Sequence, residues 1–195
     1  MDRTSHSNDP MNGTDSNDLP NVPDVDSRSC SPLEFLDAAG REVRIRPTES
    51  AERDALVEMY DALAPEDRAQ GLPPATTARI ESWLDDVLAD GHHLAAVYGV
   101  LDGAAVGHTF VLPGGERGHE LAIFVTSTHQ HAGIGTRLLD SLLADGAACG
   151  VERIWLTVRR DNVPARRLYE SAGFERVRHP ERDPLAGDLL MARPL

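Results

Sequence analysis

The sequence contains no lysine, only two cysteines and few aromatic residues. Cys30 and Cys149 stand far apart in the chain, so neither a disulfide framework nor a C-x-x-C metal site is available. Such cross-links are not needed, because a chain of 195 residues can bury a full core in a single domain. This sparse use of cysteine is typical of a reducing compartment, and we expect a cytoplasmic protein.

Long apolar segments are also missing. No run approaches the roughly 20 apolar residues that a membrane-spanning helix requires. The N-terminus is polar and acidic, whereas a secretory signal peptide begins with basic residues and continues with apolar ones. The sequence therefore predicts a soluble protein with no membrane partner.

The charge balance is the most unusual property of the composition. The 32 acidic residues exceed the 19 basic residues, all of them arginine, and give a formal net charge of −13. Charges at this density repel one another, and concentrated salt screens the repulsion. A salt-adapted cytoplasm explains the acidic excess, whereas a GC-rich genome explains arginine in place of lysine, and both interpretations stay open. Either way, nucleic acid is a disfavoured partner.

Composition also divides the chain into a tail and one domain. Residues 1–30 are mostly Ser, Asn, Asp, Thr, Gly and Pro, so apolar burial cannot offset the entropy lost on ordering them. We predict a disordered acidic and polar tail over residues 1–30 and a folded domain over residues 41–195. No internal repeat is visible.

Apolar periodicity within the domain predicts a mixed α/β (α+β) fold. We expect strands near residues 42–46, 94–101, 104–112, 120–125, 154–158, 174–178 and 189–192. We expect helices over residues 50–63, 76–90, 133–149 and 164–172. An Asp102-Gly103 turn between the second and third strands predicts a hairpin.

The stretch from Glu120 to Leu143 organises the rest of the domain. It reads as a buried strand that leads into a helix, with the sequence Q-H-A-G-I-G at residues 130–135 between them. Glycines at the start of a helix leave backbone N–H groups and the positive end of the helix dipole open to an anion such as phosphate. A Walker A loop is excluded because G-K-[ST] is absent, and Leu138 replaces the third glycine of a dinucleotide fingerprint.

Two motifs in this order carry a family resemblance. The Q-x-x-G-x-G loop at residues 130–135 resembles the pyrophosphate-binding motif of the GNAT N-acetyltransferase superfamily. Residues 162–174, N-V-P-A-R-R-L-Y-E-S-A-G-F, resemble the family's N-x-x-A-x-x-L-Y-E-x-x-G-F segment at every fixed position.

The resemblance implies the GNAT fold over residues 41–195. This fold is a mixed, mostly antiparallel twisted sheet of about six to seven strands, flanked by about four helices. The resemblance also implies acetyl-CoA as co-substrate, with its pantetheine arm along the backbone of the strand before the loop. By resemblance, the cofactor-binding residues are Ile123, Phe124, Val125, Gln130, His131, Ala132, Gly133, Ile134, Gly135, Thr136, Arg137, Asn162 and Ala165.

Acyl transfer from a thioester to an amine needs a base for the amine and an acid for the departing thiolate. By resemblance, Glu120 stands where protein-lysine acetyltransferases carry a catalytic glutamate, and Tyr169 matches the tyrosine that protonates the thiolate. A solvated glutamate and a core tyrosine are the alternative interpretations. Ribosomal-protein N-terminal acetyltransferases carry their glutamate in the following strand, where Thr157 stands here, so the resemblance disfavours that branch.

Several alternatives remain open. The implied acceptor is a primary amine, either a small molecule or a protein lysine or N-terminal amine, and a dimer is one option for the assembly. A non-catalytic acyl-CoA sensor would keep the loop without the chemistry. A dinucleotide-binding oxidoreductase is disfavoured by the hairpin before Glu120. We predict no metal, because His92-His93 and His129-x-His131 lack any recognised ligand spacing, and we expect His131 to contact phosphate instead.

Overall fold

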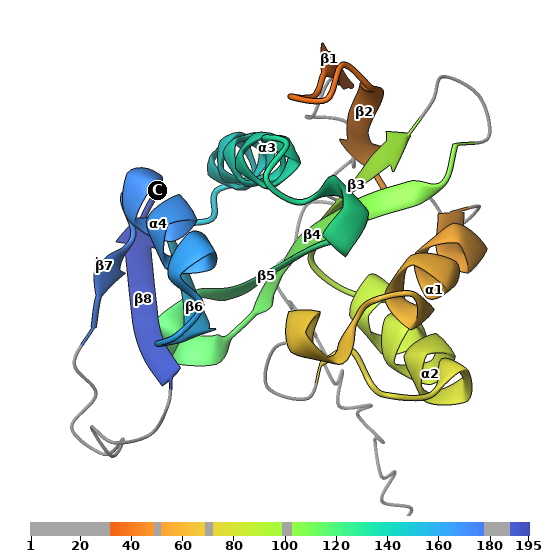
Figure 1. Cartoon of the computed structure of the whole chain (residues 1–195). Coiled ribbons are helices and arrows are strands. Elements are labelled where there is room, and N and C mark those ends of the chain that lie inside the picture. Colours follow the sequence, from red (N-terminus) through yellow and green to blue (C-terminus); the bar gives the residue numbers. More distant parts are fainter. Residues whose placement is uncertain (1–31, 49–51, 69–71, 99–102, 178–187) are drawn as a thin grey trace, which may run out of the picture.

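The computed structural model describes residues 32–48, 52–68, 72–98, 103–177 and 188–195. In these ranges eight strands form one sheet, in the order β1-β2-β3-β4-β5-β6-β8-β7, and four α-helices flank it (Figure 1). The strands are β1 Leu33–Leu36, β2 Glu42–Pro47, β3 His92–Tyr98, β4 Ala105–Pro113, β5 His119–Val125, β6 Arg153–Arg159, β7 Glu175–Arg176 and β8 Asp188–Pro194. The helices are α1 Arg53–Asp61, α2 Thr77–Leu88, α3 Ile134–Ala148 and α4 Val163–Ser171, with 3-10 turns η2 Pro65–Asp67, η3 Gly115–Arg117 and η4 Ser127–His129.

The sheet has more strands than the six to seven that the resemblance implies. The strand that sequence analysis missed is β1, which pairs with β2 through Leu33 opposite Ile45 and lies before residue 41. Its four residues are alternately half-buried and exposed, and Leu36 is 66% exposed. A strand this short at the edge of a sheet carries too little apolar alternation to be recognised from sequence.

Parts of the sequence predictions fall outside the described residues. These parts are the tail over residues 1–30, the start of the first predicted helix at residues 50–51, the end of a predicted strand at residues 99–101, Asp102 of the predicted turn and the end of a strand at residue 178. None of the described helices is long and apolar enough to cross a lipid bilayer.

Strand pairing creates a fork in the sheet. Neighbouring strands are antiparallel except β5 and β6, which run parallel. The parallel pairing covers only His119 opposite Ile154 and Glu120 opposite Trp155. β5 stays paired with β4 as far as Val125, so after Glu120 its other edge separates from β6.

Both faces of the sheet are covered. On one face α3 packs against β3 and β4, and its predicted apolar positions are buried with residues of β6 and β8. On the other face α1 and α2 pack together against β4, around Tyr60, Leu84 and Phe110 (Figure 1). β4 is therefore buried from both sides, and its first seven residues are all buried.

β4 carries a buried histidine on the face of α1 and α2. His108 is 0% exposed, and its Nδ1 forms a 2.6 Å hydrogen bond with the Tyr60 hydroxyl. The imidazole of His93 stacks on that of His108 at 5.6 Å. Burial, with a smaller contribution from the neighbouring His93, lowers the pKa of His108 to about 3. The imidazole therefore stays neutral in the folded protein.

We expect this neutral imidazole to make folding depend on pH. The folded-state pKa lies below the ordinary value of 6.5, so the unfolded chain binds the proton more readily. The contribution of His108 to stability is complete above about pH 6.5 and is lost as the pH falls toward about 3. Its part of the unfolding free energy should fall by up to about 1.4 kcal/mol per pH unit in this window. Urea unfolding between about pH 4 and 7 measures the slope.

The variant His108→Gln keeps a hydrogen-bond acceptor for Tyr60 and removes the titrating group. It should flatten the dependence of the unfolding free energy on pH, whereas the control His119→Gln should keep the wild-type slope. An unchanged slope in His108→Gln would assign the pH dependence to other groups.

Candidate active site

The fork between β5 and β6 borders a cleft of about 540 Å³. The cleft brings together five segments that are distant in the sequence. It is lined by Ile123, Phe124 and Val125 of β5; Gln130, His131, Gly133, Gly135 and Thr136 at the start of α3; Thr157, Val158, Arg159 and Asp161 at the end of β6; Asn162, Pro164, Ala165, Leu168 and Tyr169 of α4 and its cap; and Asp67 and Arg68 at η2.

The backbone N–H and C=O groups of successive β5 residues point alternately toward β4 and away from it. The carbonyl of Ala122 accepts a bond from the Thr109 hydroxyl of β4, and the backbone N–H of Thr126 donates to Val106 of β4. The carbonyl of Val125 instead accepts from the Gln130 side chain, outside the sheet. Because backbone groups alternate along an antiparallel strand, those of Ile123 and Val125 point away from β4 and toward the fork.

The loop before α3 has the backbone geometry of an anion site. Gly133 is the N-cap of α3 and has a left-handed φ of 86°, and His131 has a φ of 58°. The first helical hydrogen bond runs from the N–H of Arg137 to the carbonyl of Gly133. The N–H groups of residues 134–136 therefore have no acceptor within the helix and can serve an anion, which the helix dipole favours.

Gln130 holds the loop in place. Its side-chain amide donates to the carbonyl of Val125 at 3.0 Å and to the Asp67 carboxylate at 2.9 Å. The loop is also fastened at Ala132, whose carbonyl accepts from the N–H of Ala38 at 3.0 Å. These bonds join the loop to β5, to η2 and to the segment between β1 and β2.

Three predicted cofactor residues do not line the cleft. The side chains of Ala132 and Ile134 are buried in the core, so only their backbone groups are available to a ligand. Arg137 is exposed, and its guanidinium lies over the ring of Phe35 at 5.8 Å. All the other predicted cofactor residues line the cleft.

α4 forms another wall of the cleft. The Asn162 side chain accepts a hydrogen bond from the N–H of Ala165 at 3.1 Å and so caps the helix. Tyr169 is buried, with its ring edge-on to Phe174 at 5.8 Å. Burial raises the pKa of Tyr169 well above the usual 10, so its hydroxyl keeps its proton.

Glu120 lies at the closed end of the fork and is not among the residues that line the cleft. It is exposed, whereas Tyr169 is buried. Strand alternation places Glu120 on the same face as Ala122 and Phe124, as predicted, and Phe124 does reach the cleft. At about 3.3 Å per residue, Glu120 stands roughly 13 Å along the strand from Phe124.

Sequence analysis missed the residues that tertiary contacts bring to the cleft. Asp67 ends η2 and Arg68 follows it, far from either motif in the sequence, and neither was predicted to lie at the cofactor site. One oxygen of Asp67 is bonded to Gln130, and the other is buried without a hydrogen-bond partner in the described chain. The end of β6 could have been expected, because a strand parallel to β5 must form the second side of the fork. There Arg159 pairs with Asp161 at 2.6 Å.

This fork, with a helix N-terminus in the same cleft, defines a site for an extended anionic ligand. Comparison with known families agrees: residues 56–174 match the model described as the Acetyltransferase (GNAT) family. The match spans more than half of the chain. The chain therefore belongs to the GNAT family, whose members are acetyl-CoA-dependent acyltransferases.

Among curated proteins, the chain is similar to N-alpha-acetyltransferase 40 of Saccharomyces cerevisiae, with 45% identity over 62 residues, 28% of this chain and 22% of that protein. It is also similar to the [Ribosomal protein bS18]-alanine N-acetyltransferase of Escherichia coli, with 36% identity over 78 residues, 37% of this chain and 53% of that protein. The chain thus spans about half or less of the length of these two relatives.

Among solved structures, the GNAT domain of S. lividans PAT superposes with a TM-score of 0.69 at 21% identity, covering 84% of this chain and 97% of that one. The structure of yncA, a putative acetyltransferase from Salmonella typhimurium with acetyl-CoA, superposes with a TM-score of 0.62 at 20% identity, covering 78% and 93%. These similarities confirm the GNAT fold that sequence analysis predicted.

Proposed function

We propose that the protein is an acetyl-CoA-dependent N-acetyltransferase that moves an acetyl group to a primary amine by direct attack in a ternary complex. The observation that carries this proposal is the fork after Glu120, which meets the N-terminus of α3 and Tyr169 at one cleft. The fork offers an amide-containing arm the edge of β5 beyond its pairing with β6, the helix end suits a pyrophosphate, and the phenol is a proton donor.

Each wall of the cleft has a role in the proposed binding of acetyl-CoA. The N–H groups of residues 134–136 and the space beside Gly133 take the pyrophosphate, with His131 at its edge. The backbone of Ile123 and Val125 pairs with the pantetheine arm. Because the groups of Val125 point toward the fork, its N–H is our candidate for polarising the thioester carbonyl.

The chemistry requires two proton transfers. We assign Glu120 to accept the proton of the attacking amine and Tyr169 to give one to the CoA thiolate. The place of Tyr169 in the cleft lining supports its assignment, and burial raises the pKa of its hydroxyl, so the group enters the reaction with its proton on. Strand alternation puts Glu120, at the foot of the fork, on the face of Ala122 and Phe124, which pack with α1 and α2, so this assignment has the amine enter from that face.

We propose a protein amine as the acceptor of the acetyl group. The placement of Glu120 resembles that of protein-lysine acetyltransferases and supports a lysine side chain. The names of the yeast and E. coli relatives support an N-terminal amine. A small-molecule amine is the third class of acceptor that the experiment below compares.

The experiment is a turnover screen with the full chain in molar salt, with release of free CoA thiol as the readout. The acceptors are a lysine peptide blocked at its N-terminus, a peptide with a free N-terminal alanine, and a set of small amines including polyamines. We expect amine-dependent CoA release from one class. Acetyl-CoA binding without turnover on any class would overturn the enzyme proposal in favour of an acyl-CoA sensor.

We also propose that the acidic composition is an adaptation to salt. If so, the melting temperature should rise from dilute buffer to molar KCl, because screening relieves the repulsion of the −13 charge. Differential scanning calorimetry across KCl concentrations measures this rise. A flat or falling melting temperature would assign the acidity to another cause.

A further inference from the structure

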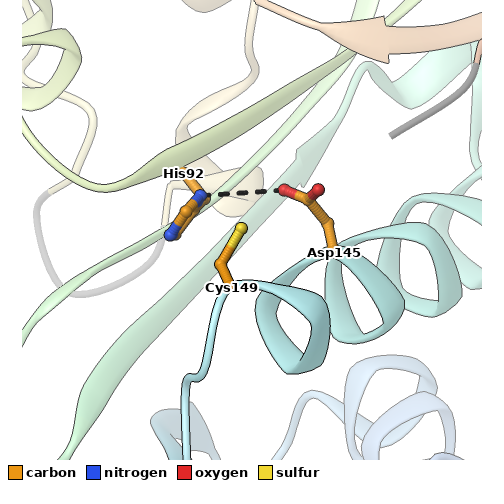
Figure 2. A group of neighbouring side chains, drawn as sticks. All are labelled: His92, Asp145 and Cys149. Carbon is orange, nitrogen blue, oxygen red and sulfur yellow. Dashed lines mark ion pairs between the residues drawn. The ribbon is translucent and has the colours of Figure 1, made fainter. Parts of the chain in front are cut away.

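Three side chains with different metal-binding atoms meet on the sheet surface beneath the C-terminal end of α3. His92 is the first residue of β3, Asp145 lies in the last turn of α3, and Cys149 is the C-cap of that helix. One ligand atom from each lies within 4.8 Å of the other two. Figure 2 shows the Cys149 thiol pointing toward the space between the imidazole and the carboxylate.

The fold explains why these residues converge. Asp145 and Cys149 are four residues apart, so they share one face of the helix end. The N–H of Cys149 donates to the carbonyl of Asp145 at 3.0 Å, which continues the helical turn through both residues. α3 packs across β3, and this contact brings His92 to the same face.

We propose that His92, Asp145 and Cys149 bind a divalent transition-metal ion of the Zn²⁺ type. Thiolate, imidazole and carboxylate are the three protein ligands of Zn²⁺, and three of them leave a fourth tetrahedral position for water. Tetrahedral ligands at ordinary Zn²⁺ distances stand about 3.3 to 3.6 Å apart. His92 Nδ1 and Asp145 Oδ2 already stand 3.7 Å apart, and all three ligand atoms lie within 4.8 Å of one another, so the side chains would close by about 1 Å or less to hold an ion.

The local electrostatics favour a cation. The carbonyls at the end of α3 carry the negative end of the helix dipole, and Asp145 adds a carboxylate beside them. The last turn of α3 contains no basic residue of its own. All three side chains are half-buried, where charge interactions are stronger than in bulk water.

A shared ion explains the geometry better than a nucleophilic triad does. In a triad the imidazole uses one nitrogen for the acid and the opposite nitrogen for the nucleophile. Here a single ligand atom of His92 lies within 4.8 Å of both the carboxylate oxygen and the sulfur. This arrangement fits three ligands around one point.

The site stands apart from the proposed active site. It lies at the C-terminal end of α3, whereas the phosphate loop lies at the N-terminal end, about 22 Å away along the 15-residue helix. A bound ion would fasten the end of α3 to β3 and so stabilise the helix that carries the loop. Failure of the metal proposal would leave the transferase proposal untouched.

Isothermal titration of the chelator-treated full chain with Zn²⁺ tests the proposal. We expect one ion per chain, with affinity that falls at lower pH because protons compete for the thiolate and imidazole. Each of Cys149→Ser, His92→Ala and Asp145→Asn should weaken binding by at least about tenfold. With Co²⁺ as a spectroscopic probe, the thiolate charge-transfer band should appear in the wild type and vanish in Cys149→Ser.

Matched controls separate this cluster from other ligands in the chain. The controls are Cys30→Ser, which removes the other cysteine, Asp140→Asn, which changes an exposed carboxylate on the same helix, and His119→Ala. All three should bind Zn²⁺ like the wild type. Circular dichroism establishes that each variant is folded. The proposal is overturned by a lack of stoichiometric Zn²⁺ binding, by binding that survives in Cys149→Ser but not in Cys30→Ser, or by Mg²⁺ binding as tightly as Zn²⁺.

Discussion

Replacing Gly133 with valine is expected to weaken acetyl-CoA binding by between about 10- and 100-fold. Gly133 has a φ of 86° at the N-cap of α3, and no atom of the described chain outside its neighbours lies within 4 Å of the position that a Cβ would take. Since Gly133 lines the cleft, that open space belongs to the proposed pyrophosphate. The valine side chain would collide with the ligand and not with the protein. Calorimetric titration with acetyl-CoA measures the loss.

Gly150 provides the matched control for backbone strain. It has a φ of 79°, its Cβ position is equally open, and it follows the opposite end of α3. Gly150→Val should therefore lower the melting temperature about as much as Gly133→Val and bind acetyl-CoA like the wild type. If Gly133→Val binds with wild-type affinity, or if both variants lose affinity equally, the pyrophosphate does not sit at this loop.

The loop and α3 could be predicted because their determinants are local. Apolar residues at helical spacing predicted which face of α3 is buried, and Ile134, Leu138 and Leu142 are indeed inaccessible to solvent. The paired glycines predicted the start of the helix, and Gly133 is its N-cap. Each of these features depends on residues within one or two turns of each other, so a single sequence contains the information.

The walls of the cleft that depend on tertiary packing could not be predicted. Asp67 reaches the loop only because α1 and α2 fold over the sheet, and the sequence around it carries no sign of Gln130. The same bond changes the interpretation of Gln130. Its side chain holds the loop to β5 and η2, so the motif needs this residue to brace the loop.

The cluster of His92, Asp145 and Cys149 was not predicted, for the same reason. The sequence around His92 and His129 contains no recognised spacing of metal ligands. Asp145 and Cys149 stand four residues apart at the end of α3, and their third partner lies on β3, far away in the sequence. Only the packing of α3 across the sheet brings the three together.

Strand alternation alone could not predict where Glu120 lies relative to the cleft. A period of two predicts the face on which a side chain lies, and it puts Glu120 on the face of Phe124. Alternation does not predict how far along the strand the cleft begins. In the structure the lining starts at Ile123, and Glu120 stays exposed at the last parallel pair of β5 and β6. Its proposed role therefore depends on the bound acceptor reaching the foot of the fork.

The variant Glu120→Gln is expected to lower turnover by roughly 10² to 10⁴ while acetyl-CoA affinity stays nearly unchanged. Glutamine keeps the shape of the side chain and removes the group that accepts the proton. Because Glu120 does not line the cleft, the proposed cofactor contacts are untouched, and binding and chemistry should separate. The acidic limb of the pH–rate profile should also vanish, since the group whose ionisation it reports is gone. Steady-state kinetics with the acceptor found in the screen, beside calorimetry with acetyl-CoA, measure both quantities.

Two further variants make this result specific. Glu152→Gln removes an exposed carboxylate just before β6 and should leave both the rate and its pH profile unchanged. Tyr169→Phe should slow the step in which the thiolate leaves, because the phenol that stays protonated in the cleft is lost. If Glu120→Gln keeps wild-type turnover across the pH range while Tyr169→Phe is impaired, Glu120 is not the base. The amine must then lose its proton to water or bind already neutral, and the acidic limb would report the ionisation of the acceptor itself.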